Sequence, residues 1–263
     1  MKSRAAAGDM TGYSHKERRL SPLQTFSRES HPLMRLLLVV SVSMAVLLPS
    51  AHATNSRPEL ESVMAMLIKW LPGEFSSKPQ LELERQYGAP PDGEHYDWHR
   101  IFARINAPHI GEHVIYGQLH IGDKNQPIVP GTQVLYIISI DEEHMAVSVS
   151  GRRIANPEQF AFAHEHPELW ATMAIDPDYG GNCDFRWRLH GNQIVGRLAQ
   201  KSEAAIDGNC SMTSKKSGIN MTWDAEWVLN DRELWIYDNG YLDDGVLFQG
   251  REDRTHIRLT RVE

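Results

Sequence analysis

Histidines, carboxylates and cysteines are the residues of this chain whose types and spacing suggest chemistry. His164 and His166 are two residues apart, so on a helix they point to different faces and cannot chelate one ion. We expect them on a solvated helix face. Asp238, Asp243 and Asp244 do not have the spacing of a calcium-binding EF-hand loop. The Asn-Gly and Asp-Gly pairs beside them favour a turn instead, and the sequence predicts no metal site.

Catalytic signatures are missing from the sequence. It contains no GxSxG nucleophile elbow, no phosphate-binding P-loop and no GxGxxG dinucleotide fingerprint. The sequence therefore gives no support for hydrolysis or nucleotide chemistry.

The two cysteines, Cys183 and Cys210, are the only ones in the chain and do not form a CxxC pair. In an oxidising compartment they are expected to form one structural disulfide. The alternative is a reactive thiol or a covalent attachment point for a ligand, which would leave one cysteine unpaired.

Aromatic residues are concentrated in the same region and have two interpretations. Trp187, Trp223, Trp227, Trp235 and Tyr237 alternate with polar residues. They either fill a packed core or form the wall of a cavity for a flat hydrophobic ligand.

The N-terminal region has the pattern of an export signal. A basic start at Met34-Arg35, an apolar run and Ala51-His52-Ala53 predict a signal peptide over residues 34–53. Residues 1–33 are then a non-native or disordered extension, or else an unusually long start of that signal. A retained membrane anchor is the alternative to cleavage, but the apolar run is short for a membrane span. We expect a periplasmic or secreted protein without stable membrane insertion after cleavage.

The charge of the remaining chain argues against anionic partners. After residue 53 the sequence has 20 Lys and Arg against 31 Asp and Glu, a net charge of −11 with neutral histidines. Nucleic acid and anionic membranes are poor partners for such a surface. Residues 54–263 are sufficient for a single domain.

The elements that must position these residues are mostly short strands. An amphipathic helix is predicted over 58–70, strands over 98–105, 113–121, 133–140, 145–154 and 257–262, and a short helix over 156–170. Several further strands are predicted between Cys183 and Gly250. About eight to ten antiparallel strands predict a mainly β protein whose sheet closes into a barrel, with an N-terminal helix and one short inserted helix. A barrel of about eight strands is wide enough for one small ligand.

Five segments together resemble the CpcT/CpeT chromophore lyase family, whose members attach linear tetrapyrroles (bilins) to phycobiliprotein cysteines. The segments, in chain order, are LIKWLPGEFSSKPQ, HRIFARINAP, IYGQLH, GNCDFRWRLHGNQIVGRL with the later Cys210, and DNGYLDDGVLFQG. The resemblance covers roughly residues 67–262 and implies a lipocalin-like (calycin) barrel with a central cavity.

One departure from the family changes the expected function. The family's P-Y-R-Q-R stretch corresponds to residues 130–134, which lack both arginines, the natural partners of bilin propionates. We therefore expect an exported barrel that binds a small hydrophobic or tetrapyrrole-like ligand. The alternatives are a bilin lyase and a structural envelope protein with a filled barrel, and the sequence does not decide between a monomer and a homodimer. The expected ligand-binding residues are Arg100, Arg104, Gln118, Gln133, Tyr136 and Trp187.

Overall fold

A computed structural model of the chain describes residues 56–91, 93–178, 181–201, 209–213 and 218–263. All of them belong to one compact unit. The predicted N-terminal extension and signal peptide lie outside the described residues.

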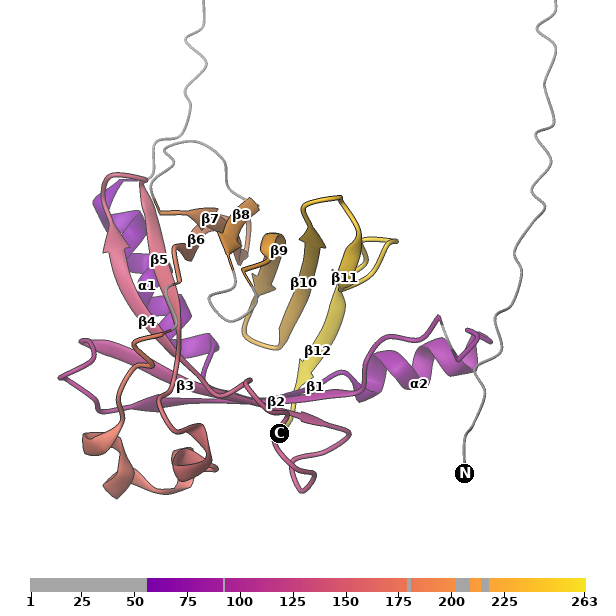
Figure 1. Cartoon of the computed structure of the whole chain (residues 1–263), viewed down its shortest axis with the longest axis horizontal. Helices are drawn as coiled ribbons and strands as arrows, with labels where there is room; N and C mark the ends of the chain where they lie inside the picture. The colour runs from indigo at the N-terminus through magenta and orange to yellow at the C-terminus, as the bar shows by residue number, and fades with distance from the viewer. Residues whose placement is uncertain (1–55, 92, 179–180, 202–208, 214–217) are drawn as a thin grey trace, which may run out of the picture. The chain divides into compact units, whose positions relative to one another are not determined.

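Strands dominate the described chain (Figure 1). The helices are α1 (Arg57–Trp70) and α2 (Lys78–Gln86), followed later by three 3-10 turns, η1 (Pro157–Phe160), η2 (Ala163–Glu165) and η3 (Pro167–Thr172). The first strands are β1 (Gly73–Ser76), β2 (Trp98–Ile105), β3 (His113–Ile121), β4 (Val134–Asp141), β5 (Ala146–Arg153) and β6 (Cys183–His190). The remaining strands are β7 (Gln193–Gln200), β8 (Asn209–Thr213), β9 (Asn220–Leu229), β10 (Glu233–Leu242), β11 (Leu247–Gln249) and β12 (Ile257–Arg261).

Ten of these strands form a closed antiparallel barrel. The order β10-β12-β1-β2-β3-β4-β5-β6-β7-β9 returns to β10 through the β10–β9 pairing, and β8 and β11 are added outside this ring. Neighbours in the ring are mostly neighbours in the chain, which is the up-and-down order of lipocalin-like barrels. The predicted mainly β barrel is confirmed.

Strand parity divides the side chains between the barrel interior and its outer face. The interior cluster includes Phe75, Phe102, Tyr136, Trp187 and Trp227. A second buried cluster lies on the outer face of β2, β3 and β4, where η1 to η3 cover the sheet (Figure 1). The single inserted helix predicted over 156–170 is therefore wrong in form, because it is three short 3-10 turns interrupted by Pro167.

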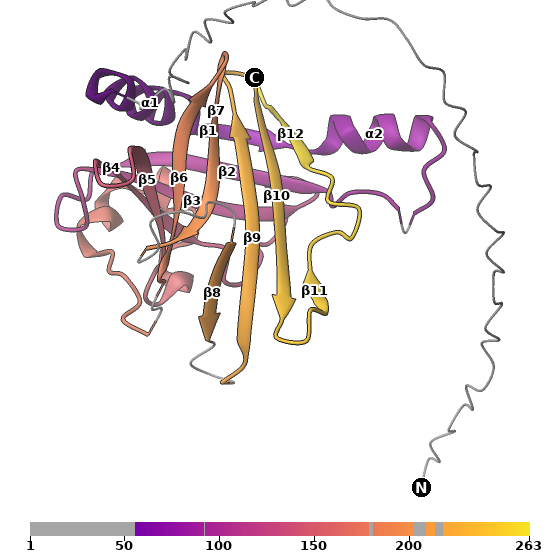
Figure 2. The same cartoon turned by 90° about the horizontal axis from the view of Figure 1, so that it is seen from above.

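Helix α1 seals one end of the barrel (Figure 2). It contacts β4, β5, β6 and β7. Its buried face inserts Leu60, Val63 and Leu67 into the interior cluster, with Leu71 following directly after the helix. The apolar spacing of this helix was evident in the sequence, and its function in the fold is to close the core at this end.

Candidate ligand site in the barrel interior

Inward-facing side chains near the end of the barrel opposite α1 keep partial solvent exposure, although most of the corresponding positions near α1 are buried. Those partly exposed residues are Trp98, Arg100, Val134, Phe185, Leu198, Met221, Trp223 and Asp238. The interior therefore has a packed half beside α1 and a more accessible half, and we name this second part the open half.

Aromatic rings form the boundary between the two halves. The ring of Trp227 lies 5.1 Å from Phe185, 5.8 Å from Tyr136 and 6.2 Å from Phe102, measured between centroids. Gly196 makes room for Trp187, since a Cβ at that position would lie 2.4 Å from its indole ring. Of these rings only Phe185 keeps partial exposure, and the others are buried behind it.

Four donor groups on inward-facing side chains have no hydrogen-bond partner among the described residues. They are the indole Nε1 of Trp187, Trp223 and Trp227 and the Nε of Arg100, all shielded from solvent. The Arg100 guanidinium lies 4.9 Å from the Trp98 ring centroid and 5.5 Å from that of Trp227. Buried donors in native proteins normally have acceptors. These four donors can therefore be satisfied by water or by a ligand rich in acceptor oxygens.

A carboxylate faces the same space. Asp238 shares the inward face of β10 with Leu234 and Ile236, which are part of the core. Burial raises the pKa of Asp238 to about 6, and the positive charge of Arg100 opposes this shift. The open half therefore combines unpaired donors with an acid that changes protonation state near neutral pH.

The six predicted ligand-binding residues lie in three different places. Arg100, Tyr136 and Trp187 face the interior. Arg104 is exposed near the end of β2.

The remaining two, Gln118 and Gln133, are buried on the outer face under η1. Gln118 Oε1 accepts from the Tyr116 hydroxyl at 2.7 Å, and Gln133 Nε2 donates to the Pro157 carbonyl at 2.7 Å. They belong to a separate polar network.

Two assignments from the sequence need correction. Asn239 and Gly240 lie within β10 rather than in a turn, and the turn comes at Asp243 to Gly245. Trp235 and Tyr237 face outward, because the register of β10 places Leu234 and Ile236 inside. The position of Asp238, two residues from Ile236, was the sequence signal that could have placed it in the interior.

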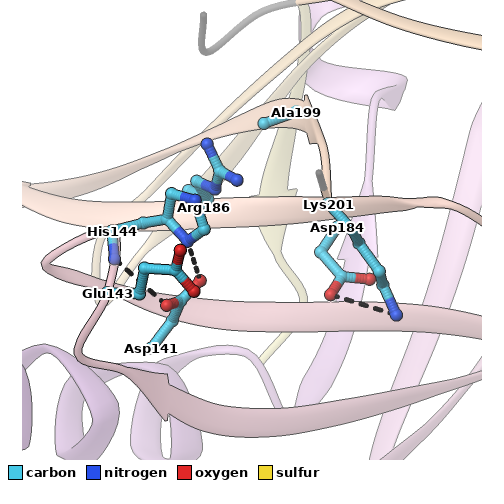
Figure 3. A pocket seen from close by; sticks show the side chains of 7 residues that line it. All are labelled: Asp141, Glu143, His144, Asp184, Arg186, Ala199 and Lys201. Carbon is cyan, nitrogen blue, oxygen red and sulfur yellow. Dashed lines mark hydrogen bonds and ion pairs between the residues drawn. The ribbon is translucent and has the colours of Figure 1, made fainter. Parts of the chain in front are cut away.

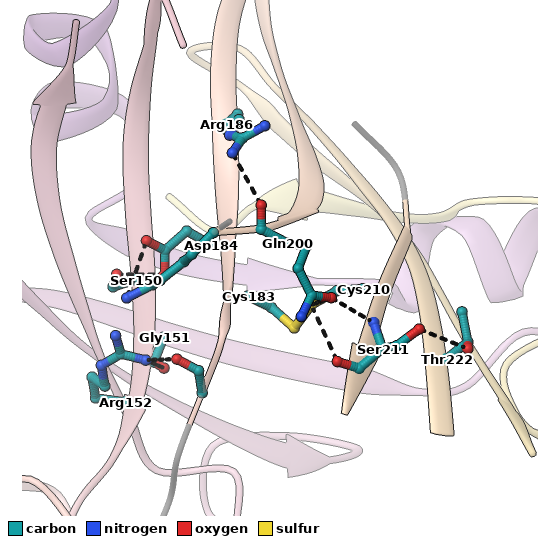
Figure 4. Close-up of a disulfide and its surroundings, with 12 residues drawn as sticks. Ser150, Gly151, Arg152, Cys183, Asp184, Arg186, Gln200, Cys210, Ser211 and Thr222 are labelled. Carbon is teal, nitrogen blue, oxygen red and sulfur yellow. Dashed lines mark hydrogen bonds and ion pairs between the residues drawn. A yellow bond between two sulfur atoms is a disulfide. The ribbon is translucent and has the colours of Figure 1, made fainter. Parts of the chain in front are cut away.

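The disulfide predicted between Cys183 and Cys210 is present, with the two Cα atoms 5.9 Å apart (Figure 4). It links β6 to β8, and Gln200 Oε1 accepts from the backbone N–H of Ser211 at 3.1 Å beside it. Because these are the chain's two cysteines, no thiol remains free for covalent chemistry.

Two polar hollows lie on the outer surface of the barrel. One, of about 210 Å³, is lined by Asp141, Glu143, His144, Asp184, Arg186, Ala199 and Lys201 (Figure 3). The other, of about 400 Å³, is lined by Arg197, Asn209, Asp224, Ala225, Glu226, Tyr237, Arg254 and His256. Their charged groups are largely paired with one another, as in Arg197 with Glu226 at 2.7 Å and Asp141 with His144 at 2.7 Å.

Two features, a metal-binding cluster and a membrane-spanning helix, are absent from the described residues. Within them, no three His, Cys, Asp or Glu side chains are arranged to hold a metal ion. No helix in this part of the chain is long and apolar enough to cross a membrane.

Comparison with known proteins identifies the fold. No family model and no curated protein matches the sequence. The structure is similar to that of the CRL protein of Arabidopsis, with a TM-score of 0.55 and 14% identity over 78% of this chain and 99% of that one. A T-type phycobiliprotein lyase, CpeT, from Prochlorococcus phage P-HM1 has a TM-score of 0.44 and 12% identity over 77% of this chain and 99% of that one. The likeness to the CRL protein is one of barrel fold.

Proposed function

We propose that this protein is an exported, divergent relative of the CpcT/CpeT lyases that binds a flat, anionic, hydrophobic ligand, a linear tetrapyrrole, in the open half of its barrel. The observation that carries the proposal is the set of unpaired donors at Arg100, Trp187, Trp223 and Trp227. A solely structural barrel gains nothing from buried donors without acceptors, because each one costs free energy of desolvation.

The chemistry of the open half fits this class of ligand. Arg100 and the indole N–H groups supply donors for carboxylate and lactam oxygens, and the partly exposed Phe185 ring supplies stacking surface. Asp238 supplies an acceptor for pyrrole N–H groups. The loss of both arginines of the family's P-Y-R-Q-R stretch favours binding over catalysis of attachment.

Export is the second part of the proposal. The disulfide between Cys183 and Cys210 supports folding in an oxidising compartment, as the sequence pattern of residues 34–53 predicts. We propose a periplasmic or secreted location on these grounds.

The alternative activity, bilin attachment, requires an acceptor thiol from another protein. Both cysteines of this chain are consumed by its disulfide, so any thioether would form on a partner. The resemblance of the five sequence segments is what favours this alternative.

Ligand binding is tested by titrating the oxidised protein with biliverdin and phycocyanobilin and following tryptophan fluorescence. Saturable quenching is expected, and Arg100→Gln should weaken binding at least tenfold. Trp235→Phe on the outer face is the matched control and should leave affinity unchanged. If only fatty acids quench, the ligand is apolar but not a tetrapyrrole. If no tetrapyrrole or fatty acid gives saturable quenching, ligand binding is rejected and a structural barrel is favoured.

A further inference from the structure

Three imidazole rings gather on the outer face of the barrel, away from the proposed ligand site. His99 on β2 and His120 on β3 lie with ring centroids 6.4 Å apart, and both are buried. The segment 156–172, which contains η1 to η3, lies against β2 through η2 and contributes His164. Phe162 connects the group, with its ring 5.7 Å from His120 and 6.3 Å from His164.

The hydrogen bonds around His120 fit a neutral ring. Its Nδ1 lies 2.6 Å from the Gln126 carbonyl oxygen, so Nδ1 carries the proton and donates. Its Nε2 lies 2.8 Å from the amide nitrogen of Gln118, which therefore donates to it. Gln118 Oε1 lies 2.7 Å from the Tyr116 hydroxyl, which also lies 2.9 Å from the Phe160 carbonyl oxygen and can donate its one proton to only one of them. A second proton on His120 would require the Gln118 amide to turn over, so that its NH2 group donates to the Tyr116 hydroxyl.

The other two histidines each have a weakly partnered ring. Among the described residues, His164 Nδ1 makes no hydrogen bond, and His99 Nε2 makes none beyond its ion-pair contact with Glu74. Burial is the largest cause that lowers the pKa of both rings, and it outweighs the carboxylates near them.

Few charges face this cluster. Glu74 on β1 lies 3.3 Å from His99 Nε2, but it also pairs with Lys124 at 3.2 Å. Glu165 lies 3.5 Å from His164 Nε2 and is mostly exposed, and His166 beside it is exposed as well. One shared carboxylate cannot neutralise several imidazolium ions.

The covering segment has little regular structure of its own and is attached to the barrel by a few contacts, among them the hydrogen bonds from Gln133 to the Pro157 carbonyl and from Tyr116 to the Phe160 carbonyl. Its three 3-10 turns are too short to be stable alone. Asn156 and Phe162 have left-handed backbone conformations, φ 52° and 57°, which are disfavoured for a bulky residue such as phenylalanine. Phe160 and Ala163 attach the segment through apolar contacts, with Met173 just beyond its end. His109 Nε2 lies 2.8 Å from the Met173 carbonyl oxygen, and this ring can donate there whether charged or neutral.

We propose that residues 156–172 form an acid-released lid, closed when His99 and His164 are neutral and opened when they gain protons. The closed state holds fewer protons than the open one, in which histidines titrate near their ordinary pKa of about 6.5. Closure is therefore fully stable above that pH and weakens as the pH falls below it, by up to about tenfold per pH unit for each histidine. This inference does not depend on the proposed tetrapyrrole binding.

The lid is tested by hydrogen exchange with mass spectrometry on the full chain between pH 7.5 and 5.0, corrected for intrinsic exchange rates. Lid peptides should lose protection at least tenfold over this range, while peptides of β9 and β10 keep theirs. The double variant His99→Gln/His164→Gln should flatten the pH dependence, whatever its effect on lid stability at neutral pH. His190→Gln, at the exposed end of β6, is the matched control and should retain it.

Three outcomes would overturn the lid. Lid protection that does not change between pH 7.5 and 5.0 would show that the histidines do not control closure. A pH dependence that survives in the double variant would assign the effect to other groups. Loss of protection in β9 and β10 in parallel with the lid would mean that acid unfolds the whole barrel.

Discussion

Asp238 places an unfavourable charge inside the barrel at neutral pH. Its raised pKa means that the folded protein retains this proton more strongly than the unfolded chain does. The folded state therefore loses stability as the pH rises from about 4 through 6, the reverse of an ion-paired aspartate. The proposed role of Asp238 in ligand binding would explain an acid at a position where it lowers stability.

Asp238→Asn should consequently stabilise the unliganded protein at pH 7.5, by about 1–3 kcal/mol on the size of the shift. The gain should shrink toward zero as the pH is lowered to about 3, where the aspartate is mostly protonated in both states. Urea unfolding at several pH values measures it. Asp178→Asn, at an exposed position, should change stability by no more than about 0.5 kcal/mol. A destabilised Asp238→Asn protein at pH 7.5 would contradict the argument.

At the residue scale, the alternation of the sequence predicted which side chains share one face of a strand. It did not predict which of the two faces points into the barrel. Gln118 shares a face with Tyr116 and His120, as period two requires. Both faces of β3 are buried, since the lid covers the outer one, so no contrast in polarity distinguishes them. Asp238 was hidden because the Asn239-Gly240 pair has the composition of a turn, although here it lies at a register shift between β10 and β11.

At the element scale, β8 depends on the disulfide. It pairs with β9 on one side, and Cys210 links it to the first residue of β6. The two cysteines are 27 residues apart, and closing such a loop in the unfolded chain is worth about 3.5 kcal/mol in the chain-entropy account. Cys183→Ala/Cys210→Ala should lower the unfolding free energy by about that amount. Hydrogen exchange should show that β8 loses protection before β9 does. A β8 that keeps wild-type protection would show that pairing with β9 alone holds it.

The loop before β12 is held by Arg251. Its Nη1 and Nη2 donate to the carbonyls of Glu94 and Gly93 at 3.0 and 3.1 Å, and the buried Asn239 fixes its backbone through two further hydrogen bonds. This contact joins β10 to the chain just before β2, next to the short β1–β12 pairing that completes the barrel.

Arg251→Ala should cost about 1.5–3 kcal/mol, because two charge-assisted hydrogen bonds are lost. Exchange should rise in residues 93–98 more than elsewhere. Arg251→Lys should recover only part of the loss, since an ammonium cannot reproduce the planar fork. Arg197→Ala, which removes a surface pair with Glu226, is the comparison and should cost less than about 1 kcal/mol. Equal losses in the two alanine variants would show that Arg251 is an ordinary surface charge.

Long periodic elements were predictable, and short ones were not. The observed β2 and β3 have the predicted bounds, and α1 begins one residue before its predicted start. Helix α2 and β1 were missed. Strand β1 has four residues, too few for a visible alternation, and α2 buries only Leu81. Strand β1 acquires its structure from pairing with β2 and β12, and α2 from packing against β12.

At the scale of the whole molecule, the barrel is asymmetric along its axis. The end covered by α1 is filled with apolar side chains, and the opposite end retains polar, partly exposed ones. If the proposed function holds, stability and ligand binding should therefore respond to substitutions at opposite ends. This separation would not occur in a uniformly packed barrel.

Leu67→Ala and Trp223→Phe test this asymmetry. Leu67 is fully buried where α1 meets the interior, so its truncation should cost about 2–5 kcal/mol while the affinity for biliverdin stays within twofold. Trp223 is partly exposed and its indole N–H is unpaired, so Trp223→Phe should leave stability within about 1 kcal/mol and weaken biliverdin binding severalfold. Urea unfolding measures the stability of each variant, and fluorescence titration measures its affinity for biliverdin. A Leu67→Ala protein that is stable but binds poorly would place the ligand beside α1, and the open half would then not be the site.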